Sequence, residues 1–285
     1  MHLRIKGDNH EKKVLNIVYR IFIIMLALIF AFPLFWTFTM SFKERGDIFT
    51  TDPPLLPTIW TLDNFREVFS TSGAVHFFRN SFLVSAMTTV VVVVLSTTCA
   101  FGLQRMAGKS SERLSNAILM LRMIPVMVLT IPLYLIFRRL GLINSLPALT
   151  MCYVALSLPL AIWLCLGFYA GIPNGIFEAA VMDGASEFQL FKDIGLPLIS
   201  NSIVVVVLQT FFFSWNELTL AMVLINKTEN RTMAVGIKYW AGNTVETPFA
   251  RMAAAGMVCI IPTVIITIFA QNYLVKGFVN GAVKG

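Results

Sequence analysis

A series of long apolar runs with almost no charged residues constrains this chain more than any other feature of its sequence. Residues 21–42 and 80–104 contain no Asp, Glu, Lys or Arg at all. Four further runs are similar in length: 114–137, 148–170, 200–224 and 252–275. Only Arg122 and Glu217 interrupt them. A helix needs about 20 apolar residues to cross the hydrocarbon core of a bilayer, so each of these runs is long enough to span it.

The same runs predict helices and not strands. Lipid offers no hydrogen-bond partners, so a spanning segment must satisfy its own backbone, and runs of this length suit helices, whereas a barrel needs shorter alternating strands. Composition agrees, because 57% of the residues are apolar and 13% are charged, against about 25% charged in a soluble domain. We therefore predict an all-α, polytopic membrane protein with six transmembrane helices.

Basic residues around the first run predict the orientation. Five precede the run: Arg4, Lys6, Lys12, Lys13 and Arg20. Only Lys43 and Arg45 follow closely, so residues 1–20 form a cytosolic tail by the positive-inside rule. The run is too long for a signal peptide and lacks a cleavage site, so it is retained. Six crossings return the tail at 276–285 to the cytosol, and the net charge of +7 needs no nucleic-acid partner.

The sequence lacks the residue patterns that several kinds of enzyme and metal site require. The four cysteines fall inside apolar runs without C-x-x-C spacing and are typical of small core residues: Cys99, Cys152, Cys165 and Cys259. No H-E-x-x-H, P-loop or G-x-S-x-G pattern occurs, so the sequence predicts no metal site, no nucleotide hydrolysis and no serine hydrolase on this chain. Any energy source must therefore lie on another chain.

The segment between the fourth and fifth runs is the most informative. Pro173 begins a short helix, and Gly184 suits its left-handed exit. Ser186 and Gln189 have capping-box spacing for a second short helix, which we expect Pro197 to end. The result is a helix-turn-helix outside the membrane with four side chains available for apolar contacts: Phe177, Val181, Phe188 and Phe191. An ordinary amphipathic connector on the membrane surface explains the same pattern.

This segment carries a family resemblance. Its pattern E-A-A-x-x-D-G-A followed by I-x-L-P resembles the EAA motif of ATP-binding-cassette importer permeases. Three other segments are similar to the shorter, maltose-type permease subunit of carbohydrate importers: Arg-Met-Ile-Pro at 122–125, residues 211–218 with Trp-Asn-Glu, and the ending 276–285. The resemblance covers nearly the whole chain, and it implies the type I importer permease fold over residues 21–285.

The resemblance also implies partners. Two permeases, similar but not identical, would form the pathway across the bacterial inner membrane. Two cytosolic ATPases would supply ATP and Mg, an extracytoplasmic binding protein would deliver a carbohydrate, and this chain would hold no cofactor. The loop at 171–199 would be the coupling loop, whose contact residues would be Glu178, Ala179, Ala180, Asp183 and Gly184. The chain has no obvious internal repeat, so a second permease is expected.

Two other classes of function compete. The nearer one is a permease of the same superfamily for an amino acid, a peptide or phosphate, which the Arg-Met-Ile-Pro and carboxyl-terminal patterns disfavour. The more distant one is a membrane-integral enzyme or sensor. That class requires catalytic groups clustered in the spans, where the charged residues reduce to Arg122 and Glu217.

Polar residues inside the fifth run suggest a translocation pathway. On a helical wheel Gln209, Phe213 and Asn216 share one stripe. The adjacent stripe carries Thr210, Ser214 and Glu217. Hydrogen-bonding groups beside aromatic rings suit a sugar. The same side chains would equally serve as bonds to neighbouring helices or to a partner subunit. In the third run, the candidate pathway residue Arg122 would pair with a carboxylate or helix end, or extend toward the membrane surface.

Overall fold

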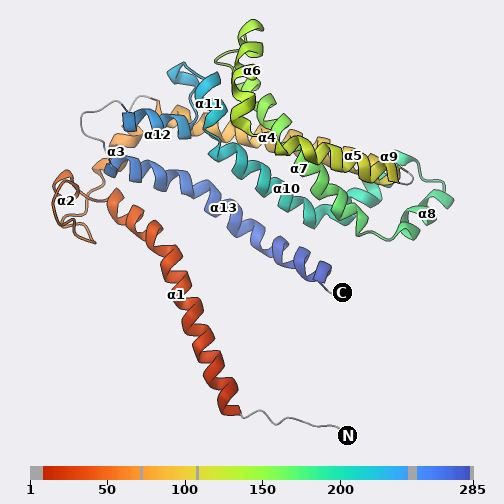
Figure 1. Ribbon diagram of the computed structural model, residues 1–285, viewed down its shortest axis with the longest axis horizontal. Coiled ribbons are helices and arrows are strands. Elements are labelled where there is room, and N and C mark those ends of the chain that lie inside the picture. Colours follow the sequence, from red (N-terminus) through yellow and green to blue (C-terminus); the bar gives the residue numbers. More distant parts are fainter. Residues whose placement is uncertain (1–8, 71–72, 107–108, 243–248, 283–285) are drawn as a thin grey trace. The chain divides into compact units, whose positions relative to one another are not determined.

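The computed structural model describes residues 9–70, 73–106, 109–242 and 249–282 and contains no strand in these ranges. The predicted all-α class is therefore confirmed (Figure 1). The described residues divide into two compact units. One comprises residues 9–70 with 249–258, and the other comprises residues 73–242 with 259–282.

The first unit contains α1 (Asn9–Ser41), α2 (Arg45–Ile48), α3 (Asp63–Ser70) and the start of α13 (Phe249–Ala282). A buried cation anchors the irregular chain after α1. Lys43 is 1% exposed, lies 4.6 Å from the ring centre of Trp36 and donates a hydrogen bond to the carbonyl of Pro54. Asn64 donates to the carbonyls of Ser41 and Lys43 at 3.0 and 2.8 Å. These bonds satisfy the backbone where α1 ends.

The second unit contains most of the other elements. They are α4 (Ala74–Arg105), α5 (Lys109–Met120), η1 (Leu121–Met123), α6 (Val126–Arg139), α7 (Leu146–Ala170), α8 (Asn174–Met182), α9 (Glu187–Gln189), η2 (Leu190–Gly195), α10 (Leu196–Asn216), α11 (Thr219–Leu224), η3 (Thr228–Asn230) and α12 (Met233–Gly242). Helices α4, α7 and α10 pack together as its central bundle. Small buried residues such as Ser96, Ala161 and Cys165 line the contact between α4 and α7 and allow close approach.

Five helical segments are long and apolar enough to cross a membrane: Leu15–Ser41, Ala74–Arg105, Leu146–Ala170, Glu187–Asn216 and Phe249–Gln271. They coincide with five of the six predicted runs. The sixth run, 114–137, is a pair of helices bent by 85°, and it brings the number of spans to six if the pair counts as one. The bend lies at Ile124 and Pro125. Ile124 has extended dihedrals (φ −71°, ψ 118°), the conformation that a following proline favours.

The fifth span differs from the prediction at both ends. It was expected at 200–224, but the helical chain begins at Glu187 and ends at Asn216. Pro197 does not end the second loop helix, because a π-helical turn at Leu190–Gly195 precedes it and Pro197 then occupies the first turn of α10. Proline is tolerated in a first turn, where its missing N–H costs little. At the other end Glu217 adopts extended dihedrals, and α11 begins as a separate helix.

The two ends of the central bundle carry different structures (Figure 1). At one end, Asn80 of α4 donates to the carbonyls of Glu229 and Arg231, and Asn144 accepts a hydrogen bond from the N–H of Lys227 at 2.7 Å. The segments that carry Asn144 and Lys227 thus meet at one end of the unit. The loop between α7 and α10 lies at the opposite end, where α4 terminates at Arg105.

Candidate functional site

The loop between α7 and α10 folds as the predicted helix-turn-helix. Helix α8 follows Pro173, and Gly184 has φ +84°, the left-handed exit expected of a glycine. The N–H groups of Gly184 and Ala185 donate back to the carbonyls of Val181 and Ala180, both at 3.0 Å. This bonding pattern satisfies the last carbonyls of the helix and turns the chain sharply.

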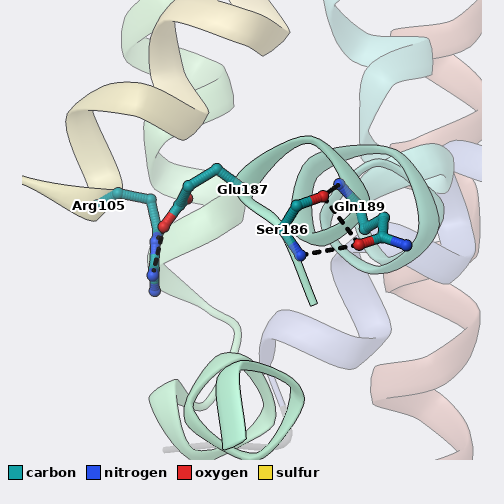
Figure 2. Close-up of polar contacts among 4 residues, drawn as sticks. All are labelled: Arg105, Ser186, Glu187 and Gln189. Atoms are coloured by element: carbon teal, nitrogen blue, oxygen red, sulfur yellow. Dashed lines mark hydrogen bonds and ion pairs between the residues drawn. The ribbon is translucent and has the colours of Figure 1, made fainter. Parts of the chain in front are cut away.

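The second loop helix begins with the predicted capping box, drawn in Figure 2. The Ser186 hydroxyl accepts from the N–H of Gln189, and the Gln189 side-chain oxygen accepts from the N–H of Ser186 at 2.8 Å. Two backbone donors of the first turn are satisfied in this way. The turn between α8 and α9 is therefore defined from both sides, by Gly184 and by Ser186.

An aromatic cluster attaches the loop to α4. The Phe101 ring lies 5.6 Å from Tyr169, 6.0 Å from Phe177 and 5.4 Å from Phe191, measured between ring centres. A Cβ atom at Gly195 would lie 3.2 Å from the Phe101 ring, so the glycine permits this close approach. Of the four apolar side chains predicted for this loop, Phe177 and Phe191 therefore make their contacts within the chain.

The outer face of the loop combines acidic and apolar groups. Glu178 and Asp183 are exposed, as are Ala179 and Gly184, while Ala180 is half-buried. Beside them lie four apolar side chains that are also exposed: Ile176, Val181, Met182 (86% exposed) and Phe188 (68%). An exposed apolar patch rimmed by carboxylates is typical of a protein-binding surface.

A cavity of about 440 Å³ lies beside the bend at Pro125. Its walls are mostly apolar and come from η1, α6, α7 and α10. Arg122 and Phe213 line it together, with the guanidinium carbon 5.2 Å from the centre of the Phe213 ring. Nη1 of Arg122 also donates to the carbonyl of Leu156 at 2.7 Å. Within the described ranges, no carboxylate lies within ion-pairing distance of Arg122.

The chain matches the family described as the inner membrane component of binding-protein-dependent transport systems, over residues 93–280. This match includes the helix-turn-helix, the cavity, α7, α10 and the second part of α4. The chain belongs to this family. It is accordingly a multi-pass inner-membrane transport subunit and not an enzyme.

Individual relatives cover nearly the whole permease. The trehalose transport system permease protein SugB of Mycobacterium tuberculosis is 33% identical over 89% of this chain and 92% of its own length. The trehalose/maltose transport system permease protein MalG of Thermococcus litoralis is 32% identical over 96% and 99%. A chain in the crystal structure of a bacterial ABC transporter that imports the acidic polysaccharide alginate has the same fold, with a TM-score of 0.74, 20% identity, and coverage of 94% of this chain and 99% of that one.

The other predicted pathway residues of this permease lie outside the cavity lining. Ser214 is buried and bonds within its own helix to the carbonyl of Thr210, and the exposed Asn216 bonds to that of Phe212. Gln209, which lies one helical turn before Phe213, is half-buried. Glu217 caps α11, accepting from the N–H of Leu220 at 3.0 Å and from a tyrosine on α7. The structure brings only Arg122 and Phe213 together at the cavity.

Sequence reasoning missed three residues that organise these sites. Phe101 is one of 24 phenylalanines, and nothing in its surroundings marks it as the centre of the aromatic cluster. Tyr153 contacts Glu217 across 64 residues of sequence. Arg105 is the first charged residue after an uncharged run, which signals the end of a span but not its partner. Within the described residues, no group of three metal-binding side chains exists.

Proposed function

We propose that this permease subunit imports a carbohydrate, such as a disaccharide, an oligosaccharide or a polyol, by alternating access. The names of its relatives support this substrate class, because they include permeases for trehalose, trehalose/maltose and diacetylchitobiose. These relatives cover 89–96% of this chain. The termini and the loop at 171–199 would lie on the cytosolic side.

The helix-turn-helix is the observation that carries the proposal. Its outer face offers Glu178 and Asp183 beside exposed Met182, while its inner face packs on Phe101. Carboxylates can pair with a basic rim, and a short apolar helix can enter a groove. One of two ATPase subunits, carrying ATP and Mg, would bind here and transmit its closure to the spans. A second, homologous permease would complete the pathway.

An extracytoplasmic binding protein would deliver the sugar from the opposite side. A related alginate transporter is known in complex with a pentasaccharide-bound periplasmic protein, and it shares the fold at a TM-score of 0.70. At the other end of the bundle two polar loops are joined by a hydrogen bond of 2.6 Å from the Asn230 side chain to the carbonyl of Asn144, and we propose this end as the surface that receives the binding protein. The sugar would then pass the cavity lined by Arg122 and Phe213.

Transport in proteoliposomes tests the coupling role. The permease, its partner permease, the ATPases and the binding protein are reconstituted, and sugar uptake and ATP hydrolysis are measured together. We expect Glu178→Lys and Gly184→Pro to reduce uptake per ATP without preventing membrane insertion or permease assembly. Normal transport by both variants, or uptake of amino acids or phosphate in place of sugars by the parent, contradicts the proposal.

A second set of variants tests the pathway. Arg122→Gln and Phe213→Leu are expected to slow sugar uptake, because each removes a group that faces the cavity. Arg139→Gln, at the end of α6, is the matched control, since its exposed side chain lies outside that lining. Uptake at the parental rate by both cavity variants places the pathway elsewhere. Variants at Gln209, Ser214, Asn216 and Glu217 then locate it.

A further inference from the structure

A two-point ion pair joins the start of α9 to the end of α4. Nη2 of Arg105 lies 3.0 Å from Oε1 of Glu187, and Nε lies 3.3 Å from Oε2, as Figure 2 shows. The two residues are 82 positions apart in the sequence. Because the guanidinium and the carboxylate are both planar, two parallel bonds fix the orientation of the pair as well as its distance.

The pair also suits the helix ends that carry it. Glu187 occupies the first turn after the Ser186 cap, where a negative charge is favourable, and Arg105 occupies the last turn of α4, where a positive charge is favourable. The Arg105 side chain is 31% exposed and that of Glu187 is 67% exposed. Exposed ion pairs contribute about 0–1 kcal/mol to stability. The main consequence of this pair is therefore geometric: it fixes the position of the loop relative to α4.

Helix α4 is well placed to pass on a movement of the loop. It packs along α7 and α10, and these helices supply Leu156, Pro159 and Phe213 to the cavity lining. The aromatic cluster around Phe101 holds the buried side of the loop against α4. The Arg105–Glu187 pair holds its exposed side. Two attachments, one on each side, prevent the loop from pivoting about a single contact.

We propose that Arg105 and Glu187 are positioning residues for energy coupling, so that α4 moves with the helix-turn-helix when the ATPases close. This inference rests on the proposed coupling role of the loop. Neither side chain has to touch the sugar or ATP. Loss of the pair leaves the aromatic cluster as the remaining attachment, so the loop can pivot about that cluster and passes less of its movement to α4.

The test measures sugar uptake per ATP hydrolysed in the reconstituted complex. We expect Arg105→Gln and Glu187→Gln each to lower this ratio about five-fold, the lower end of typical coupling effects, while the amount of ATPase bound to the permease stays at the parental level. The charge swap Arg105→Glu with Glu187→Arg is expected to recover part of the ratio, because it restores the two-point bond but places each charge at the less favourable helix end. Arg105→Lys, which keeps the charge but loses the two-point geometry, should fall between Arg105→Gln and the parent.

Arg66→Gln is the matched control, since Arg66 forms an exposed ion pair with Asp63 at 3.1 Å outside the loop. It should leave the ratio unchanged. A parental ratio in both single variants overturns the inference, as does a decrease that only follows loss of bound ATPase, or a charge swap no better than the single variants. The proposed function itself fails if Glu178→Lys also couples ATP hydrolysis to uptake normally, or if the parent imports no sugar. A failure of the Arg105–Glu187 inference can therefore be distinguished from a failure of the proposed function.

Discussion

The hydroxyl of Tyr153 on α7 donates a hydrogen bond of 2.7 Å to the carboxylate of Glu217, the residue at which α10 ends. The same carboxylate accepts from the N–H groups of Leu220 and Ala221, both at 3.2 Å through Oε2. A glutamate that looks like an interruption of an apolar span therefore ends one helix and caps the next. Tyr153 holds it in place from a neighbouring helix.

This relationship predicts a stability difference between two buried tyrosines of α7. Tyr153→Phe should lower the free energy of unfolding by about 1.5–3 kcal/mol, the usual loss for a hydrogen bond to a charged group. Tyr169→Phe is the matched control, because the Tyr169 hydroxyl is equally buried and has no hydrogen-bond partner among the described residues. Denaturant titration of the purified permease measures both. Equal losses in the two variants would show that the Tyr153 bond contributes nothing specific.

Two glycines of the helix-turn-helix should respond oppositely to alanine. Gly184 has φ +84°, where a side chain costs about 1–2 kcal/mol, so Gly184→Ala is expected to destabilise the turn. Gly175 lies in α8 with no atom within 4 Å of an added Cβ, so Gly175→Ala should stabilise the helix by up to about 1 kcal/mol. Hydrogen exchange of the α8 amides reports both changes. The prediction is wrong if Gly184→Ala protects these amides as well as Gly175→Ala does.

Steric contact around Gly236 predicts a compensating pair. A Cβ atom at this position would lie 2.2 Å from the buried Phe77 ring. Gly236→Ala should therefore destabilise the fold by about 1–3 kcal/mol through overpacking. Phe77→Leu removes ring atoms and should make the alanine less costly, so the double variant is expected to lose less than the sum of the two singles. Thermal unfolding of all three measures the interaction, and strict additivity would contradict it.

The capping box predicts a local effect at the start of α9. Ser186→Ala removes the acceptor for the N–H of Gln189 and should cost about 1 kcal/mol. Ser186→Asp offers another good cap and should retain most of the stability. Exchange of the Gln189 amide is the measurement, with acceleration expected only in the alanine variant. Equal rates in the two variants would show that the side-chain cap is unimportant there.

Much of the fold was predictable because it depends on local patterns. Uncharged runs of about 20 residues must become helices in lipid, and five of the six runs are single long helices. The turn at Gly184 and the cap at Ser186 were also predictable, since both depend on backbone preferences within a few residues. The predicted end of the second loop helix at Pro197 was wrong, because proline is tolerated in a first helical turn and Pro197 lies in the first turn of α10. The third run bends at Pro125 and still gives a sixth span if the bent pair counts as one.

The sequence by itself determined that the chain lies in a lipid bilayer, that its fold is all-α, and where the helix-turn-helix occurs. These features follow from hydropathy and turn chemistry, which act over short distances along the chain. Only the tertiary structure decided which residues meet. Arg105 reaches Glu187 across 82 positions, Tyr153 reaches Glu217 across 64, and Arg122 meets Phe213 at the cavity. No local rule specifies these pairs, because each depends on how α4, α7 and α10 pack against one another and on where η1 meets α6.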